Sequence, residues 1–419
     1  MTDFVTELLN IPDTNVLSCK ITDEAVYIYI ESTETKIPCR NCGKETKAKG
    51  SGQEVKLRHL PILGKPCYLI IKPKRGICGH CDDAPTTNQR LEWYKYKSRS
   101  TNAYEEYVLL SLVNSTVTDV AIKENIGPDA VDGILKRRIN GEVNWKHFHK
   151  LGLLGVDEIS LKKGHQNFVT LITSRIDSKT RILGVIKGRE KAKTKVFLSN
   201  IPRRLKRTVA GICCDMYEGY VNAPKEVFKE KAPVIIDRYH VARLYRKSLV
   251  SLRKSELARL RAELTKEDYQ LLKPAIALLR KNKEFVTKDE RKVLEPLFRH
   301  SPALKVGHKL CCQLTGIYNS HIGKRKAHDK INDWIGKVKT SSLGCFNRFI
   351  ETLKKFKIEI IAYFKGRNTS GFVEGFNNKV KVLKRRCYGI YDENSLFRRL
   401  FLDCTGYDTF LARQGIQAI

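Results

Sequence analysis

The chain has 419 residues, with 78 Lys and Arg against 45 Asp and Glu, which gives a formal net charge of +33. One hydrophobic core rarely serves so long a chain, so we expect several domains, and 42% hydrophobic residues are enough to make them globular. Because the positive charge is spread over the whole chain, it predicts a polyanionic partner, most simply nucleic acid. A basic protein associated with ribosomes would have the same balance.

The first residues and the cysteines indicate the compartment. The stretch MTDFVTELLNIPDTN is acidic and lacks the basic and apolar regions of a signal peptide. No apolar run reaches the ~18–20 residues that a membrane span needs, so we expect no membrane association. With 13 cysteines and no secretion signal, the sequence predicts a cytoplasmic protein whose thiols are free or bound to metal.

Two Cys-x-x-Cys pairs lie in the segments KIPCRNCG and RGICGHC. Four thiolates in two tight turns suit one tetrahedral zinc ion, and the paired spacing makes four free cysteines the weaker interpretation. Between the pairs, EVKLRHL and CYLIIKPK alternate as ribbon strands do. We predict an N-terminal segment over 1–35 and a zinc-ribbon domain over 36–84. The predicted structural Zn²⁺ ligands are Cys39, Cys42, Cys78 and Cys81. His59 and His80 could replace one of them, but we expect both at the surface.

A helix-turn-helix is predicted within residues 95–145. The segments VTDVAIKE and PDAVDGILKRRI read as two helices joined by NIG, in which Gly127 supplies the turn and Pro128 suits the first helical position. The second helix ends in three cations that suit contact with DNA phosphates, namely Lys136, Arg137 and Arg138. An ordinary helical hairpin would have the same pattern, and the basic composition favours DNA binding.

The next segment changes to α/β character. Three apolar runs, LGLLGVDEIS, NFVTLITSRI and RILGVIKG, read as an antiparallel meander. A helix, the strand TVAGICCDM, another helix and the strand APVIIDRYHV follow. This order is typical of a ribonuclease-H-like fold. We therefore predict such a domain over 150–403, with a helical insertion at about 241–350, where charged segments have helical periodicity, and a C-terminal tail over 404–419.

Two carboxylates follow strand runs that this fold makes neighbours. Asp157 ends the run GVD and Asp215 ends the run CCD. Carboxylates this close repel each other unless a cation lies between them, and Mg²⁺ prefers oxygen ligands. A third carboxylate, Glu374, lies in the later helical segment GFVEGFNNKVKVLKRR. Three carboxylates can hold two metal ions that activate the attacking oxygen and stabilise the leaving oxygen of a phosphodiester, without a covalent enzyme intermediate.

Polar residues follow Glu374 at helical spacing. They lie four, seven and eleven positions later, on the face that carries the glutamate, and they are Asn378, Lys381 and Arg385. An amide and two cations beside a carboxylate that faces metal suit a DNA phosphodiester. This arrangement predicts that the helix contacts DNA next to the reacting phosphate.

The motifs in this order resemble bacterial DDE transposases of the ISL-three insertion-sequence family. The resemblance extends from about residue 36 to residue 403 and rests on the zinc ribbon, the helix-turn-helix and the stretches GVDEIS, CCDMYEGY, VIIDRYH and GFVEGFNNKVKVLKRRCYG. It implies that the catalytic triad, which binds Mg²⁺ or Mn²⁺, is Asp157, Asp215 and Glu374. It also implies that Lys381 lies beside the terminal phosphate or base. Ser370 stands where many relatives have Arg, so that DNA contact has no counterpart.

The resemblance implies a transposase that binds double-stranded DNA at terminal inverted repeats. It would cleave the phosphodiester at each element end and transfer the 3′-OH to target DNA by a two-metal mechanism. Because two ends must be held together, we expect a homodimer or higher oligomer on DNA, in the cytoplasm of a bacterium and associated with its nucleoid. Two alternatives are a non-catalytic DNA-binding regulator derived from a transposase and a structure-specific nuclease of the same fold.

Other polar residues near these motifs have simpler interpretations. Asp237 and His240, in VIIDRYH, are either a helix cap and its neighbour or auxiliary groups of the metal site. Glu158 should point to the opposite strand face from Asp157, toward solvent. Cys213 and Cys214 have no partner at metal-ligand spacing, so we expect them to be core thiols.

Overall fold

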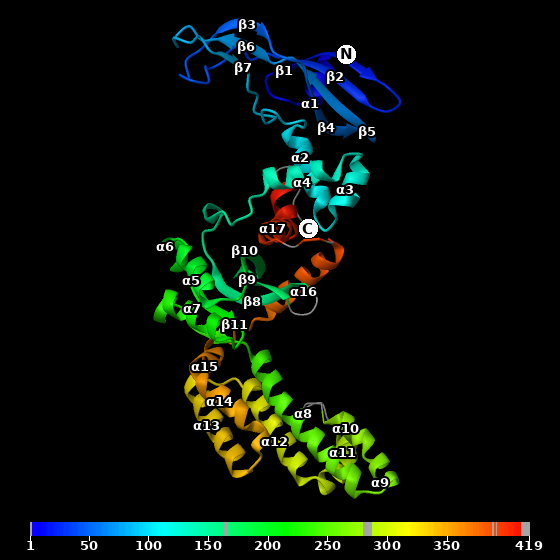
Figure 1. Cartoon of the computed structure of the whole chain (residues 1–419), viewed down its shortest axis with the longest axis vertical. Helices are drawn as coiled ribbons and strands as arrows, with labels where there is room; N and C mark the ends of the chain where they lie inside the picture. The colour runs from blue at the N-terminus through cyan, green and yellow to red at the C-terminus, as the bar shows by residue number, and fades with distance from the viewer. Residues whose placement is uncertain (1, 163–165, 280–286, 388, 391, 412–419) are drawn as a thin grey trace. The chain divides into compact units, whose positions relative to one another are not determined.

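The computed structural model separates the chain into two compact units (Figure 1). Unit 1 comprises Met1–Gly141, Arg385–Gly389 and Arg398–Ile419, and unit 2 comprises Glu142–Lys384 and Ile390–Phe397. No helix in the described part of the chain is both long and apolar enough to cross a bilayer. The residues that the structure describes are 2–162, 166–279, 287–387, 389–390 and 392–411.

Unit 1 begins with a sheet that crosses the predicted boundary at residue 35. Helix α1 (Thr2–Leu9) precedes strands β1 (Thr14–Ile21) and β2 (Val26–Ser32), and β2 pairs in parallel with β5 (Lys65–Ile71). With β4 (Val55–Ile62), they form a sheet of order β1-β2-β5-β4. The runs EVKLRHL and CYLIIKPK are strands as predicted, but they belong to this sheet and not to the zinc ribbon. The first 35 residues are therefore part of the same fold as the residues that follow them.

The ribbon itself is a smaller sheet of order β3-β6-β7 (Lys47–Ser51, Lys74–Ile77 and Thr86–Asn88). The pair Cys39/Cys42 precedes β3, and the pair Cys78/Cys81 lies between β6 and β7. His80 is exposed, as predicted. The prediction for His59 is wrong, because this residue lies in β4, is 7% exposed and has its Nδ1 2.9 Å from Thr101 Oγ1. Burial lowers its pKa to about 4.

The helix-turn-helix has the predicted helices. They are α2 (Asn102–Leu112), α3 (Val117–Glu124) and α4 (Pro128–Arg138), and Gly127 caps α4 with Pro128 at its first position. A later helix, α17 (Glu393–Phe410), adds Leu402 and Phe410 to the core of these three helices. The predicted boundary at residue 403 is therefore wrong, since it divides α17. Residues 412–419 of the predicted tail lie outside the described residues.

The sheet of unit 2 has the order β10-β9-β8-β11-β12. Its strands are β8 (Gly152–Lys162), β9 (Gln166–Ile176), β10 (Lys179–Lys187), β11 (Val209–Cys214) and β12 (Val234–Ile236). The first three strands along the chain are antiparallel, whereas β11 runs parallel to both β8 and β12. Helices α5 (Lys191–Asn200), α6 (Arg203–Lys206) and α7 (Glu218–Phe228) come between the strands. Cys213 and Cys214 are buried core thiols, as predicted.

The predicted insertion is helical and has two parts (Figure 1). The end of α8 (Arg238–Glu263), α9 (Lys266–Leu271), α10 (Lys273–Leu278), α11 (Lys288–His300) and the start of α12 (Pro302–Asn319) share a separate hydrophobic core. The other part shares the core of the sheet. It comprises the rest of α12 and the helices α13 (Lys324–Thr340), α14 (Asn347–Lys355) and α15 (Lys357–Gly366), of which α15 packs beside β12. The last helix of this unit is α16 (Gly371–Arg386).

Replacing Asp403 by Asn should destabilise unit 1. The Asp403 side chain is 2% exposed, forms an ion pair with Arg386, and accepts a hydrogen bond from the backbone N–H of Asn114 at 3.0 Å. Its other ion-pair partner, Arg399, is also buried. Without the carboxylate, two largely buried guanidinium groups lose their counter-charge, which costs about 3–5 kcal/mol. Chemical unfolding of Asp403→Asn measures this loss. The control Glu393→Gln, at a half-buried acid in the first turn of the same helix, should lose less than about 1 kcal/mol, and an equal effect would contradict the role of the buried pair.

Unit 1 should lose stability as the pH falls from about 6.5 to about 4. In this range the unfolded chain protonates His59, whereas the buried imidazole stays neutral because its pKa is lowered to about 4. The unfolded state therefore binds more protons, and the full loss is on the order of 3 kcal/mol. Unfolding titrations at several pH values should show a weaker pH dependence in His59→Gln. The same substitution at exposed His80 should leave the pH dependence unchanged.

Candidate active site and metal centre

Two carboxylates lie on adjacent strands at the centre of the sheet in unit 2. The parallel pairing of β11 with β8 puts Cys214 opposite Val156, so Asp157 and Asp215 occupy the next position on neighbouring strands. This confirms the predicted neighbourhood of the two strands. Asp157 does not end its strand, however, because β8 continues to Lys162 and pairs Asp157 with Leu171 of β9. Burial raises the pKa of Asp157, and the charge of Asp215 raises it further.

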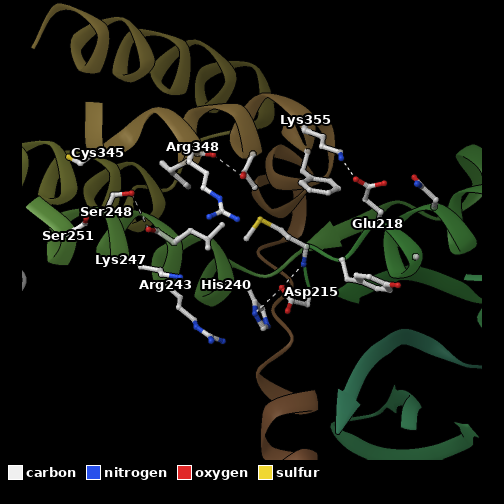
Figure 2. A pocket seen from close by; sticks show the side chains of 18 of the residues that line it. Asp215, Glu218, His240, Arg243, Lys247, Ser248, Ser251, Cys345, Arg348 and Lys355 are labelled. Carbon is white, nitrogen blue, oxygen red and sulfur yellow. Dashed lines mark hydrogen bonds and ion pairs between the residues drawn. The ribbon is translucent and has the colours of Figure 1, made fainter. Parts of the chain in front are cut away.

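The start of α8 adds two polar side chains beside these two carboxylates. His240 Nδ1 lies 3.0 Å from Asp215 Oδ1, so the imidazole is next to the carboxylate (Figure 2). Asp237 has the position of the helix cap and accepts a hydrogen bond from the backbone N–H of Tyr239 at 2.5 Å. Its second oxygen accepts hydrogen bonds from the backbone N–H and the hydroxyl of Ser370. Asp237 therefore ties the end of β12 to the start of α16.

Helix α16 contacts β8 through a residue that the sequence analysis missed. Asn377 Nδ2 donates a hydrogen bond to Asp157 Oδ2 at 2.6 Å, and the buried Asn377 Oδ1 has no hydrogen-bond partner in the described part of the chain. A Cβ at position 155 would lie only 2.3 Å from Val373 Cγ2, so Gly155 allows this close approach. Asn377 lies three residues after Glu374, which puts the two on adjoining faces of α16 and is the signal that could have identified it.

The other predicted residues of α16 form an exposed stripe. Glu374, Asn378, Lys381 and Arg385 are all exposed, which agrees with their predicted common face. The described structure records no hydrogen bond or ion pair for Glu374, and its carboxylate oxygens do not form one compact cluster with those of Asp157 and Asp215. Asp157 and Asp215 are thus brought together, and Glu374 lies one helical turn from Asn377, which touches Asp157.

The side-chain oxygens around Asp157 and Asp215 suit a hard divalent cation. Asp157, Asp215 and the carbonyl oxygen of Asn377 are oxygen donors, the ligand type that Mg²⁺ prefers. The buried Asn377 Oδ1 without a partner and the raised pKa of Asp157 are both conditions that a bound cation would relieve. Glu158 is half-buried and lies 3.9 Å from Arg189, so its side chain is engaged away from Asp157.

A second metal site lies in the zinc ribbon of unit 1. The Sγ atoms of Cys39, Cys42, Cys78 and Cys81 all lie within 4.8 Å of one another. Backbone N–H groups at the two turns point at the sulfurs, with Asn41 N 3.4 Å from Cys39 Sγ and His80 N 3.3 Å from Cys78 Sγ. Hydrogen bonds from the backbone lower the pKa of Cys39 to about 6. This donor set fits a closed, structural zinc site.

The cations at the end of α4 are largely engaged within unit 1. Arg137 Nη2 lies 2.7 Å from buried Glu105 of α2, and Arg138 Nη2 lies 2.5 Å from Glu106. Lys136 forms an ion pair with Asp132 one turn earlier. The ion pairs of Arg137 and Arg138 fix α4 against α2. A DNA phosphate would have to compete with these acids for the same cations, so the phosphate contacts stay a prediction.

A loop that the sequence analysis did not single out offers further cations beside α4. A cavity of about 690 Å³ is bounded by the start of α4 and by Lys95, Tyr96, Lys97 and Arg99. Tyr96 is 59% exposed. Basic residues interleaved with an exposed aromatic ring are typical of nucleic-acid contact.

Family models match the chain in the order of these parts. A model described as a transposase matches residues 154–400, more than half of the chain. The helix-turn-helix domain of transposase family ISL3 matches residues 89–139, and the zinc-finger of the transposases of IS204, IS1001, IS1096 and IS1165 matches residues 35–81. Two adjacent carboxylates on central strands of a sheet, preceded along the chain by a zinc ribbon and a helix-turn-helix, are the features of a DDE transposase. The chain belongs to the ISL3 family of insertion-sequence transposases, which confirms the resemblance of its motifs.

Two insertion-sequence transposases are similar to this chain over most of its length. The transposase of insertion sequence element IS1001 from Bordetella parapertussis is 24% identical over 376 residues, which cover 89% of this chain and 90% of the relative. The transposase of IS1557 from Mycobacterium tuberculosis (strain ATCC 25618 / H37Rv) is 20% identical over 392 residues, covering 88% and 86%. Among solved structures, the Drosophila P element transposase strand transfer complex aligns with a TM-score of 0.39 and 11% identity, covering 73% of this chain and 91% of that chain.

Purified protein should contain one zinc ion per chain. Replacing both Cys39 and Cys42 by Ser leaves only two thiolate ligands, so zinc should be lost and the ribbon should unfold locally. Elemental analysis and protection of the ribbon from proteolysis measure the two effects. The matched control is Cys213→Ser with Cys345→Ser, which removes two thiols outside the cluster and should keep the zinc. Full zinc content in Cys39→Ser/Cys42→Ser would contradict the ligand assignment.

Proposed function

We propose that Asp157, Asp215 and Glu374 hold two divalent cations, Mg²⁺ or Mn²⁺, with which this transposase cleaves DNA at the ends of its element and joins the freed 3′-OH to target DNA. The observation that carries the proposal is the adjacent position of Asp157 and Asp215 on β8 and β11. A pair of carboxylates here is unfavourable without a cation, as the raised pKa of Asp157 indicates. Glu374 completes the set from the exposed face of α16.

The catalytic part of unit 2 is, in this proposal, ribonuclease-H-like. Support comes from the strand order β10-β9-β8-β11-β12, in which an antiparallel meander is followed by two parallel strands reached through helices. This topology brings the first and fourth strands together at the centre of the sheet. The fold therefore brings two of the proposed ligands together, and the third comes from the later helix α16.

The residues of the chain have distinct tasks in this mechanism. When bound, the two cations would activate the attacking water or 3′-OH and neutralise the leaving oxygen. Asn377 holds the Asp157 carboxylate through its amide hydrogen bond, and His240 holds that of Asp215. Asp237 and Ser370 fix the start of α16, the helix that carries Glu374 in its first turn. In this proposal Asp237 and His240 position the ligands, which is the auxiliary one of the two roles that the sequence left open.

The DNA-binding parts have complementary tasks. The zinc ribbon and the helix-turn-helix bind the terminal inverted repeats, and Asn378, Lys381 and Arg385 contact the phosphates beside the scissile bond. The exposed cations of the α4 end and of the loop around Tyr96 contribute phosphate contacts. Since two ends must be joined to one target, the active assembly on DNA is a homodimer or a higher oligomer.

Replacing Asp215 by Asn should remove cleavage while DNA binding stays within about twofold of the wild type. Loss of one charged ligand should lower the cleavage rate at least ~10³-fold, which corresponds to roughly 4 kcal/mol of transition-state stabilisation. The substrate is a plasmid that carries the gene with its native flanks, and new 3′-OH ends and strand-transfer joints are mapped with Mg²⁺ or Mn²⁺. The neighbouring acid Glu158 provides the matched control Glu158→Gln, which should retain cleavage.

Metal binding gives a readout that does not depend on catalysis. At a Mn²⁺ concentration about ten times its dissociation constant, Mn²⁺ should raise the free energy of unfolding of the wild type by about 1.4 kcal/mol. The melting temperature should then rise by a few degrees. Asp157→Asn/Asp215→Asn should show no such shift. Tight binding to the inverted repeats without cuts under either metal would instead favour a non-catalytic DNA-binding regulator.

A further inference from the structure

A cavity of about 1080 Å³ opens beside Asp215 within unit 2 (Figure 2). One wall is a face of α8, along which His240, Arg243 and Lys247 follow at steps of three and four residues and therefore share one side of the helix. The other wall is α14, from which Arg348 and Lys355 line the space. The sequence analysis assigned most of α8 to the helical insertion at about 241–350, a range that includes only the start of α14, and it gave Arg243, Lys247 and Arg348 no role.

Three of the cavity's cations have no acidic partner among the residues that the structure describes. Lys191 and Lys355, at its edge, form ion pairs with Glu226 and Glu218. Arg243, Lys247 and Arg348 are exposed, and across the described residues none of the three side chains has a hydrogen bond or an ion pair. In Figure 2 the Arg348 side chain extends from α14 toward the side on which His240 and Asp215 lie. Three cations in a concave surface attract a ligand with several negative charges.

We propose that this cavity binds a short segment of a single DNA strand, whose phosphates contact Arg243, Lys247 and Arg348 as the strand leaves Asp215. The inference rests on the proposed function, because it supplies the path of the DNA next to the proposed metal ligands. Tyr217, 38% exposed at the same mouth, offers a ring on which a base can stack. The insertion would thus hold the reacting DNA as well as enlarge the fold.

The dimensions favour one strand over a duplex. The volume is near the upper limit of small-molecule pockets, roughly 1,000 Å³, which suits a few nucleotides and is too small for both strands. The arrangement of the cations favours a strand over a free nucleotide. Free nucleotides usually place their phosphates on backbone N–H groups at one helix N-terminus, whereas these cations come from two walls, with Arg243 and Lys247 on the side of α8 and Arg348 in the first turn of α14. Arg243 and Lys247 are about 6 Å apart along α8, so they can contact separate phosphates.

The test compares two triple variants of the full-length protein that remove equal charge. Arg243→Gln/Lys247→Gln/Arg348→Gln changes the cavity, and Lys273→Gln/Arg299→Gln/Lys309→Gln changes three exposed cations of the insertion outside it. Fluorescence anisotropy measures binding of a labelled 15-nucleotide single strand without divalent metal, at several salt concentrations. The cavity variant should bind at least tenfold more weakly, and its salt slope should fall by about 2, whereas the control should stay within twofold. Melting temperatures verify that both variants fold.

Each other outcome would overturn the proposal. Wild-type affinity in the cavity variant, or equal losses in both variants, would mean that the strand binds elsewhere or without a defined site. Displacement of the strand by ATP at concentrations below 1 mM, with no gain in affinity from 5 to 15 nucleotides, would identify a free-nucleotide site. A cleavage assay of Asp215→Asn distinguishes the proposed metal ligands from the proposed strand site. If this variant still cleaved DNA, the metal ligands would be refuted, whereas the measurement of strand binding would be unaffected.

Discussion

The parallel pairing of β11 with β8 is the constraint on which the active site depends. It puts Asp157 next to Asp215, which directly follows β11, and both burial and the charge of Asp215 raise the pKa of Asp157. The surrounding side chains reduce this cost, since Asn377 donates to Asp157 and His240 lies against Asp215. Such a site is poor for stability and suited to a cation, which is the condition that a metal-dependent phosphoryl-transfer enzyme requires.

Contacts along the whole length of α16 hold this helix against the sheet. Asp237, at the end of β12, receives two hydrogen bonds from Ser370 immediately before the helix. Gly155 then allows Val373 to pack directly on β8, and Lys384 donates to the carbonyl of Ser160 further along the same strand. These contacts fix the rotation of α16 about its axis. That rotation decides which of its residues face the carboxylates and which face solvent.

Much of this arrangement could be predicted from local sequence, and the errors share a physical cause. The strands of unit 2 and the helix-turn-helix have strong periodicity and clear turn residues. Their positions, and the proximity of Asp157 to Asp215, could therefore be predicted. Asn377, which donates to Asp157, was missed because the sequence analysis followed the face of Glu374 and Asn378, and one residue rotates a helical position by about 100°. The pairing of β2 with β5 and the packing of α17 on α2–α4 join distant segments, and local patterns carry no information about such contacts.

Net charge predicts nucleic-acid binding without identifying the cations that do it. Arg137 and Arg138 end a helix of the helix-turn-helix, the place where sequence reasoning expects phosphate contacts, yet both are paired with acids of α2. Arg243, Lys247 and Arg348 stand in segments with no DNA-binding motif, and within the described structure they have no acidic partner. A cation already paired must exchange one anion for another to bind phosphate, whereas one without a partner gains the whole interaction. The pairing of charges in the fold, more than their density in the sequence, therefore determines where this transposase can hold DNA.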